Sequence, residues 1–79
     1  MKAKDLIRQA QQDQAKDVPP EAVKALKQVL AYNDTAPHKR RVTMAATLPM
    51  LVDYGWTGVT RYALEALCRK LGRKNFGSP

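Results

Sequence analysis

The sequence predicts an all-α fold: a small domain of three to four helices, with a helix-turn-helix-like pair near the C-terminus. Apolar residues recur at helical spacing in 20–33 and again in 58–71, and turn formers and prolines separate these segments. The 79 residues suffice for a single domain, 1–79. A chain this short buries only about 60% of the surface that it exposes when unfolded, so self-association as a homodimer stays open as a source of stability.

Residues 2–17 form the weakest of the predicted helices. Their apolar stripe has only two large residues, Leu6 and Ile7, and a glutamine-rich tract follows it. Two such residues cannot hold a helix of this length firmly against a core. We expect a frayed arm or a loosely docked helix here, followed by a helical core with a basic tail over residues 20–79.

The clearest amphipathic helix begins near Pro20 and ends near Asn33. Proline suits the first helical turn, and Glu21 complements the positive end of the helix. Apolar residues share one side of this helix: Ala22, Val23, Leu26, Val29 and Leu30. Turn formers and Pro37 end it, and the basic connector 38–41 follows.

The start of the next helix depends on which threonine caps it. A cap at Thr43 places Pro49 in the helix interior, where proline costs about 3 kcal/mol. A cap at Thr47 places Pro49 in the tolerated first turn and gives a short helix over 47–54 that Gly55 closes. We therefore predict the start at Thr47, with an extended stretch or a separate helical turn before it.

The last predicted helix covers residues 58–71, after a tight turn that contains Gly55 and Gly58. Its apolar residues sweep more than half of its circumference: Val59, Ala63, Leu64, Leu67, Cys68 and Leu71. A face this broad places the helix at the centre of the core. We expect Trp56, in the turn, to be at least partly buried against this helix, and the tail after Leu71 to be irregular.

Together the last two predicted helices have the proportions of a helix-turn-helix. Gly55 stands where that motif has its turn glycine, and Leu64 matches a core position of the second helix. Leu51 and Arg61 depart from the motif, because a small residue and a branched apolar residue are usual at these positions. An ordinary αα-hairpin is the alternative.

The net charge of +7 lies almost wholly in the second half of the chain. Residues 1–37 carry six Lys/Arg against five Asp/Glu, a balance of +1, whereas residues 38–79 carry eight against two, a balance of +6. Such asymmetry favours a polyanionic partner. A solvated surface that promotes solubility is the alternative.

We predict duplex DNA as the partner, contacted mainly at its phosphate backbone. The candidate nucleic-acid-binding residues are Lys39, Arg40, Arg41, Arg61, Arg69, Lys70, Arg73 and Lys74. Those before and after the predicted pair form arms that suit phosphates or a minor groove. Arg61, in the first turn of its helix, suits a base edge. Glu65 lies one turn from Arg61 and Arg69, and surface ion pairs with it could occupy both.

A small adaptor or inhibitor that binds a host protein is the alternative function. An acidic surface on that protein would match the same charge asymmetry. Three aromatic residues near basic ones have the composition of an interface: Trp56, Tyr62 and Phe76.

Catalysis has little support in the sequence, and we expect no enzyme activity, no metal site and no cofactor. His38, the only histidine, lies in the basic connector, and Cys68 lies in an apolar helical pattern typical of a small core residue. One histidine and one cysteine fall short of a metal site. A lone cysteine forms no intrachain disulfide, which fits a reducing cytoplasm, and no run of about 18 apolar residues predicts a membrane span.

The stretch from about Val42 to Pro79, which ends LGRKNFGSP, resembles small accessory proteins encoded by bacteriophages and other mobile elements. The resemblance covers about half of the chain. It implies either DNA binding, as by a phage-encoded regulator, or interference with a host protein in the bacterial cytoplasm. It adds no functional residue to those named above.

Overall fold

A computed structural model describes residues 18–79 of the chain; the predicted N-terminal helix or arm, 2–17, lies outside them. In chain order the elements are α2 (Pro20–Thr35), the 3-10 helix η2 (His38–Arg40), α3 (Met44–Asp53) and α4 (Arg61–Lys70). The described residues thus contain three α-helices and no strand, and the all-α prediction is confirmed for this part of the chain.

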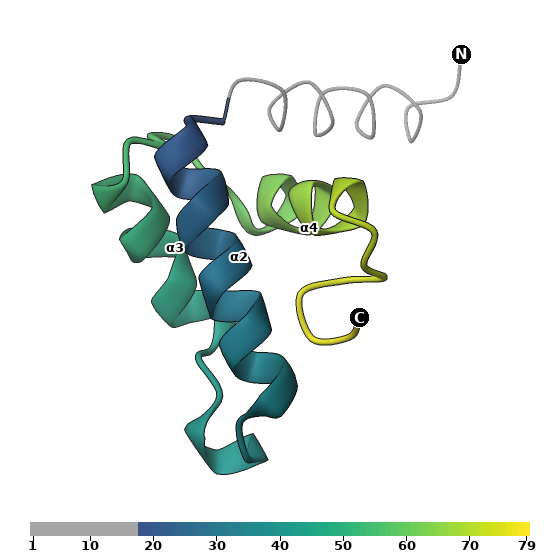
Figure 1. Ribbon diagram of the computed structural model, residues 1–79. Helices are drawn as coiled ribbons and strands as arrows, with labels where there is room; N and C mark the ends of the chain where they lie inside the picture. The colour runs from purple at the N-terminus through teal and green to yellow at the C-terminus, as the bar shows by residue number, and fades with distance from the viewer. Residues whose placement is uncertain (1–17) are drawn as a thin grey trace.

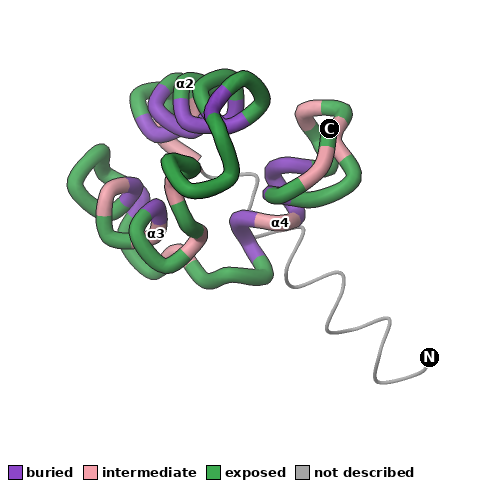
Figure 2. The backbone as a smooth tube through the Cα atoms, turned by 90° about the horizontal axis from the view of Figure 1, so that it is seen from below, coloured by how far each residue is buried: buried purple, intermediate pink, exposed green. Residues whose placement is uncertain are grey.

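The three helices surround one core. Helix α2 is the longest, with α3 on one side of it and α4 on the other (Figure 1). Helix α3 contacts both of its neighbours. The buried stretches of the helices face the interior, whereas their outer sides are exposed (Figure 2). None of the helices in this part of the chain is long and apolar enough to cross a membrane.

Each helix contributes one fully buried leucine to the core: Leu26 from α2, Leu51 from α3 and Leu64 from α4. Trp56 joins them from the turn between α3 and α4, and only 5% of its surface is exposed. This burial confirms the prediction for Trp56. Phe76 from the C-terminal tail also enters the core, with 7% of its surface exposed.

Helix α2 follows its prediction closely. It starts at Pro20, and Glu21 lies in its first turn. In its last turns, Asn33 is buried although it is polar. The amide side chain of Asn33 accepts a hydrogen bond from the N–H of Val42 at 2.8 Å and donates one to the carbonyl of Val42 at 2.9 Å. The last turn of α2 therefore positions the chain that leaves η2.

The predicted start of α3 at Thr47 is wrong. Thr43 caps the helix, and its hydroxyl oxygen accepts a hydrogen bond from the N–H of Ala46 at 3.1 Å. Thr47 is fully buried, and its hydroxyl donates to the carbonyl of Thr43 at 2.8 Å. Pro49 lies inside the helix, and both Pro49 and Ala45, whose carbonyl loses its helical partner, are exposed residues.

Helix α4 starts three residues later than predicted. Thr60 caps it, with its hydroxyl accepting from the N–H of Ala63 at 3.1 Å. Gly58 has a φ of +74°, which a helix cannot contain, so the turn continues past it. Residues 54–60 consequently separate α3 from α4, whereas a helix-turn-helix has a turn of about three to four residues.

Candidate nucleic-acid interface

Seven of the eight predicted nucleic-acid-binding residues are exposed: Lys39, Arg40, Arg41, Arg61, Arg69, Lys70 and Lys74. They do not form one continuous set. Residues 39–41, the connector cluster, follow the C-terminal end of α2, whereas Arg69, Lys70 and Lys74, the α4-end cluster, lie at the far end of α4 and in the tail (Figure 1). Arg61 stands alone at the first position of α4.

Arg73 is the exception among the eight residues. Its side chain is only 13% exposed and forms an ion pair with Asp34 at 2.8 Å. The hydrogen bond from Arg73 lowers the pKa of Asp34 below its ordinary value of 3.8, and the positive charge of the guanidinium acts in the same direction. This is the only ion pair among the described residues. Arg73 therefore serves the fold, as a link between the tail and α2.

One donor of Arg73 has no partner. Its Nε is buried and forms no hydrogen bond with any described residue. A buried donor without an acceptor costs about 1–3 kcal/mol, so an acceptor from outside the described residues would be favoured there.

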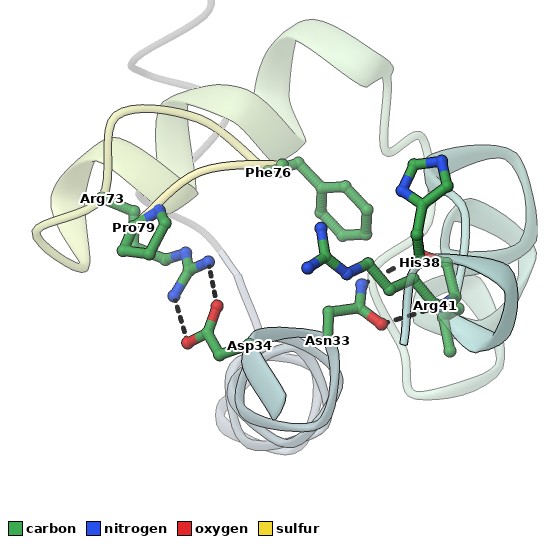
Figure 3. Close-up of a pocket in the computed structure, with 9 residues that line it drawn as sticks. Asn33, Asp34, His38, Arg41, Arg73, Phe76 and Pro79 are labelled. Carbon is green, nitrogen blue, oxygen red and sulfur yellow. Dashed lines mark hydrogen bonds and ion pairs between the residues drawn. The ribbon is translucent and has the colours of Figure 1, made fainter. Parts of the chain in front are cut away.

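A cleft of about 470 Å³ opens between the tail and the connector (Figure 3). The residues that line it come from the end of α2, the connector and the tail: Asn33, Asp34, His38, Arg41, Val42, Arg73, Phe76, Gly77 and Pro79. The sequence pattern predicted interface roles for Arg41, Arg73 and Phe76 but not for Asn33 or Asp34. An Asn on the apolar side of a helix end was the available signal, because a buried amide needs a partner.

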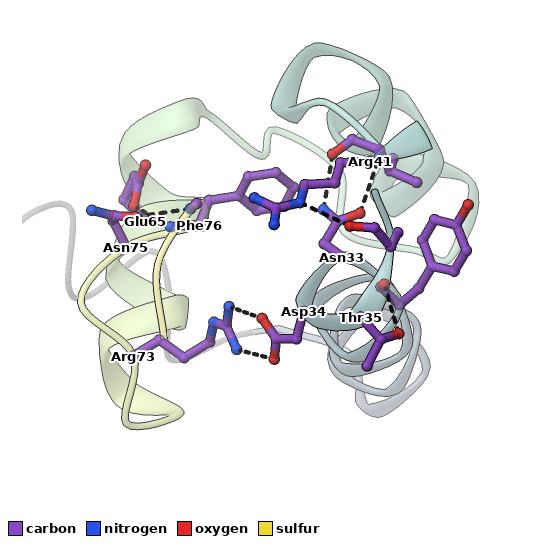
Figure 4. Close-up of polar contacts among 12 residues, drawn as sticks. Asn33, Asp34, Thr35, Arg41, Glu65, Arg73, Asn75 and Phe76 are labelled. Carbon is purple, nitrogen blue, oxygen red and sulfur yellow. Dashed lines mark hydrogen bonds and ion pairs between the residues drawn. The ribbon is translucent and has the colours of Figure 1, made fainter. Parts of the chain in front are cut away.

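The backbone around Arg41 is held firmly. Its N–H donates to the carbonyl of His38 at 3.4 Å, and the next residue, Val42, is bound on both sides by Asn33. The side chain uses one donor internally, since Nε donates to the carbonyl of Ala36 at 3.3 Å (Figure 4). The terminal amino groups of Arg41 have no hydrogen-bond partner among the described residues.

Glu65 does not pair with Arg61 or Arg69, as the sequence had suggested. Its Oε2 accepts a hydrogen bond from the backbone N–H of Phe76 at 3.0 Å (Figure 4). The carboxylate thus fixes the tail against α4. In the described part of the chain, neither Arg61 nor Arg69 forms an ion pair with it.

The three aromatic residues named for a protein interface lie in different environments. Trp56 and Phe76 are buried in the core, whereas Tyr62 on α4 is 59% exposed. Tyr32 and Tyr54, for which no interface role was predicted, are also well exposed. Of the three named residues, Tyr62 alone presents its ring to the surface.

The two residues considered for catalysis are far from equivalent. Burial, together with the negative charge of Glu65, raises the pKa of the Cys68 thiol to about 11, so the thiol is protonated at neutral pH. This agrees with its prediction as a core residue. His38 is exposed and lines the cleft. No group of three His, Cys, Asp or Glu side chains that could hold a metal occurs within residues 18–79.

Comparisons with known proteins find no matching family model, no matching curated protein and no matching solved structure.

Proposed function

We propose that this protein binds duplex DNA, mainly through the phosphate backbone. The supporting observation is the group of seven exposed Lys and Arg side chains that no carboxylate of the described residues pairs with. Residues 18–79 contain ten Lys/Arg and four Asp/Glu. With Asp34 paired to Arg73, nine Lys/Arg remain against three Asp/Glu, so the outward field is strongly positive.

The two clusters have the role of phosphate contacts in this proposal. Long, exposed Lys and Arg side chains suit phosphate oxygens, and contacts of this kind fix position without reading sequence. Arg61 has a different role in this proposal, a contact with a base edge, because it is exposed in the first turn of α4 and stands apart from both clusters. Since the α3–α4 connection is longer than that of a helix-turn-helix, the proposed role of Arg61 depends on its exposure and not on the motif.

A salt titration of binding to a random-sequence duplex tests the proposal. Each phosphate contact contributes about 0.9 to the slope of log affinity against log salt concentration. Replacing Lys39, Arg40 and Arg41 together by alanine should weaken binding to all sequences alike and flatten that slope by up to about 3 units. The same measurement on the variant with Arg69, Lys70 and Lys74 replaced reports on the second cluster.

Two exposed lysines on α2, Lys24 and Lys27, provide the control. Replacing both by alanine removes charge away from the connector and should leave most of the slope intact. Wild-type binding without salt dependence, together with unchanged affinity in the connector variant, would refute DNA binding.

A protein partner is the second candidate function, in keeping with a phage-type adaptor or inhibitor. The observation that favours it is the exposure of Tyr62 beside Arg61 at the start of α4, since Tyr and Arg are enriched in interface hot spots. Capture from a nuclease-treated bacterial lysate tests this candidate. Loss of the captured protein in Tyr62→Ala, with DNA binding unchanged, would favour it over DNA.

A further inference from the structure

We propose that the cleft between the connector and the tail holds a single phosphate group, carried by a nucleic-acid strand or by a free nucleotide. The cleft is built from segments far apart in the sequence: the end of α2, η2 with the residue that follows it, and the tail (Figure 3). A phosphate site here is independent of duplex binding, because a free phosphate ion can occupy it.

The charges around the cleft favour an anion. Two guanidinium groups line it, those of Arg41 and Arg73, and a single Asp or Glu carboxylate, that of Asp34. Arg73 neutralises Asp34 with two hydrogen bonds, at 3.0 and 2.8 Å. The charge of Arg41 also lowers the pKa of Asp34, but among the described residues Arg41 forms no ion pair, so the two arginines and one carboxylate leave one net positive charge at the cleft.

Arg41 also holds hydrogen-bond donors that suit a phosphate, and contacts within the fold position them. Its Nε is used by the carbonyl of Ala36, and the hydrogen bonds of Val42 with Asn33 hold the backbone beside it. Its two terminal amino groups stay available. A guanidinium donates parallel hydrogen bonds to two oxygens of a phosphate, a geometry that the ammonium of lysine does not provide.

The wall of the cleft that the tail forms limits which group can be attached to the phosphate. Phe76 is held in place by burial and by the hydrogen bond from its N–H to Glu65. Its ring and the side chain of Arg41 reach toward the same part of the cleft (Figure 3). His38 lines the cleft from the connector side. At about 470 Å³ the cleft exceeds a phosphate group and leaves room for the attached sugar.

Titration of the full chain with inorganic phosphate, followed by amide chemical shifts in nuclear magnetic resonance, tests the site. Ionic strength is kept constant with sodium chloride. We expect saturable shifts at the amides of Arg41, Val42, Phe76 and Gly77. Arg41→Gln should weaken the phosphate affinity by about tenfold or more, the usual effect of losing a hydrogen bond to a charged group.

Arg61→Gln is the matched control, because it removes an exposed arginine that does not line the cleft. It should leave the phosphate affinity unchanged. Arg41→Lys keeps the charge without the paired donors and should bind phosphate more weakly than the wild type. Amide spectra without phosphate show whether each variant keeps the wild-type fold. If Arg41→Gln does not fold, the phosphate affinity of Arg41→Lys tests the site in its place.

Short single-stranded oligonucleotides with and without a 5′-phosphate, and a nucleoside monophosphate, identify the source of the phosphate. Preference for the phosphorylated end assigns a terminal phosphate, and equal binding assigns an internal phosphodiester. Binding of the monophosphate alone assigns a free nucleotide. Shifts that do not saturate, that chloride reproduces, or that persist equally in the Arg41 variants would overturn the phosphate site. Failure of duplex binding alone would leave it standing.

Discussion

The guanidinium of Arg73 lies against the carboxylate of Asp34, with Nη1 3.0 Å from Oδ2 and Nη2 2.8 Å from Oδ1. The two residues are 39 positions apart, and their pair ties the tail to the last turn of α2. Charge alone suggested a phosphate contact for Arg73. Its bidentate contact with Asp34 uses both terminal nitrogens within the fold, while the neighbouring Arg41 keeps its own terminal nitrogens available.

The Asp34–Arg73 pair predicts a loss of stability in acid. The pKa of Asp34 is lower in the folded protein than its ordinary value of 3.8. The ion pair therefore contributes fully to the free energy of unfolding at pH values above 3.8, and this contribution is lost as the pH falls through the pKa of the folded state. Thermal unfolding between about pH 2 and pH 7 should therefore show a smaller drop in Tm for Asp34→Asn than for the wild type. Asp53→Asn, which changes another exposed carboxylate, should keep the wild-type profile; equal profiles for all three proteins would contradict the prediction.

Truncation of Trp56 should destabilise the fold strongly. The indole is almost fully buried among the leucines of the three helices, and removal of a buried tryptophan costs about 3–5 kcal/mol. Urea unfolding followed by circular dichroism measures the cost of Trp56→Ala. Tyr62→Ala removes an aromatic ring of similar kind from the surface and should leave the midpoint almost unchanged. Similar midpoints for the two variants would mean that Trp56 is not a core residue.

Glu65 should control the order of the tail. Its carboxylate accepts the hydrogen bond from the N–H of Phe76, and a hydrogen bond to a charged group contributes about 1.5–3 kcal/mol. Glu65→Ala should speed hydrogen exchange at the Phe76 amide, whereas Glu65→Gln keeps an oxygen acceptor and should restore part of the protection. Glu21→Ala serves as the control for loss of a carboxylate. Protection of Phe76 that survives Glu65→Ala would show that burial of the ring holds the tail without this bond.

Pro49 should be a weak point of α3. It lies inside the helix and deprives the carbonyl of Ala45 of its hydrogen bond, at a cost of up to about 3 kcal/mol relative to alanine. Pro49→Ala should therefore raise the free energy of unfolding, by less than that amount because the unfolded chain gains freedom. A lower urea midpoint in Pro49→Ala would contradict a continuous helix from Met44 to Asp53. Pro37→Ala, outside the α-helices, should not produce the same gain.

Arg61 should affect discrimination between DNA sequences and not general affinity. It stands at the first position of α4, apart in the chain from both basic clusters. If the protein has a preferred site, Arg61→Ala should reduce the preference by about 1–3 kcal/mol, the usual value of a bidentate base contact. Competition between specific and random duplexes measures this. A uniform loss of affinity for all sequences would instead assign Arg61 to a phosphate.

Local features of the sequence determined the helical class of the described residues, the extent of α2, and the burial of Trp56 and Cys68. Periodic apolar residues, a proline in a first turn and glycines in a turn act over a few residues, so the sequence shows them directly. The predicted start of α3 was wrong because the sequence shows the local cost of Pro49 inside a helix but not the tertiary packing that offsets this cost. A start at Thr43 lets the helix bury Thr47 and Leu51 against the core.

Only the tertiary structure decided which charged side chains form contacts within the fold and which stay free to bind a partner. Arg73 and Glu65 are polar residues of ordinary appearance in the sequence, yet one pairs with Asp34 and the other with the backbone of Phe76. The cleft likewise joins the end of α2 to a tail about 40 residues later. Contacts over such distances depend on how helices pack and where the tail returns, and no short sequence pattern encodes either of them.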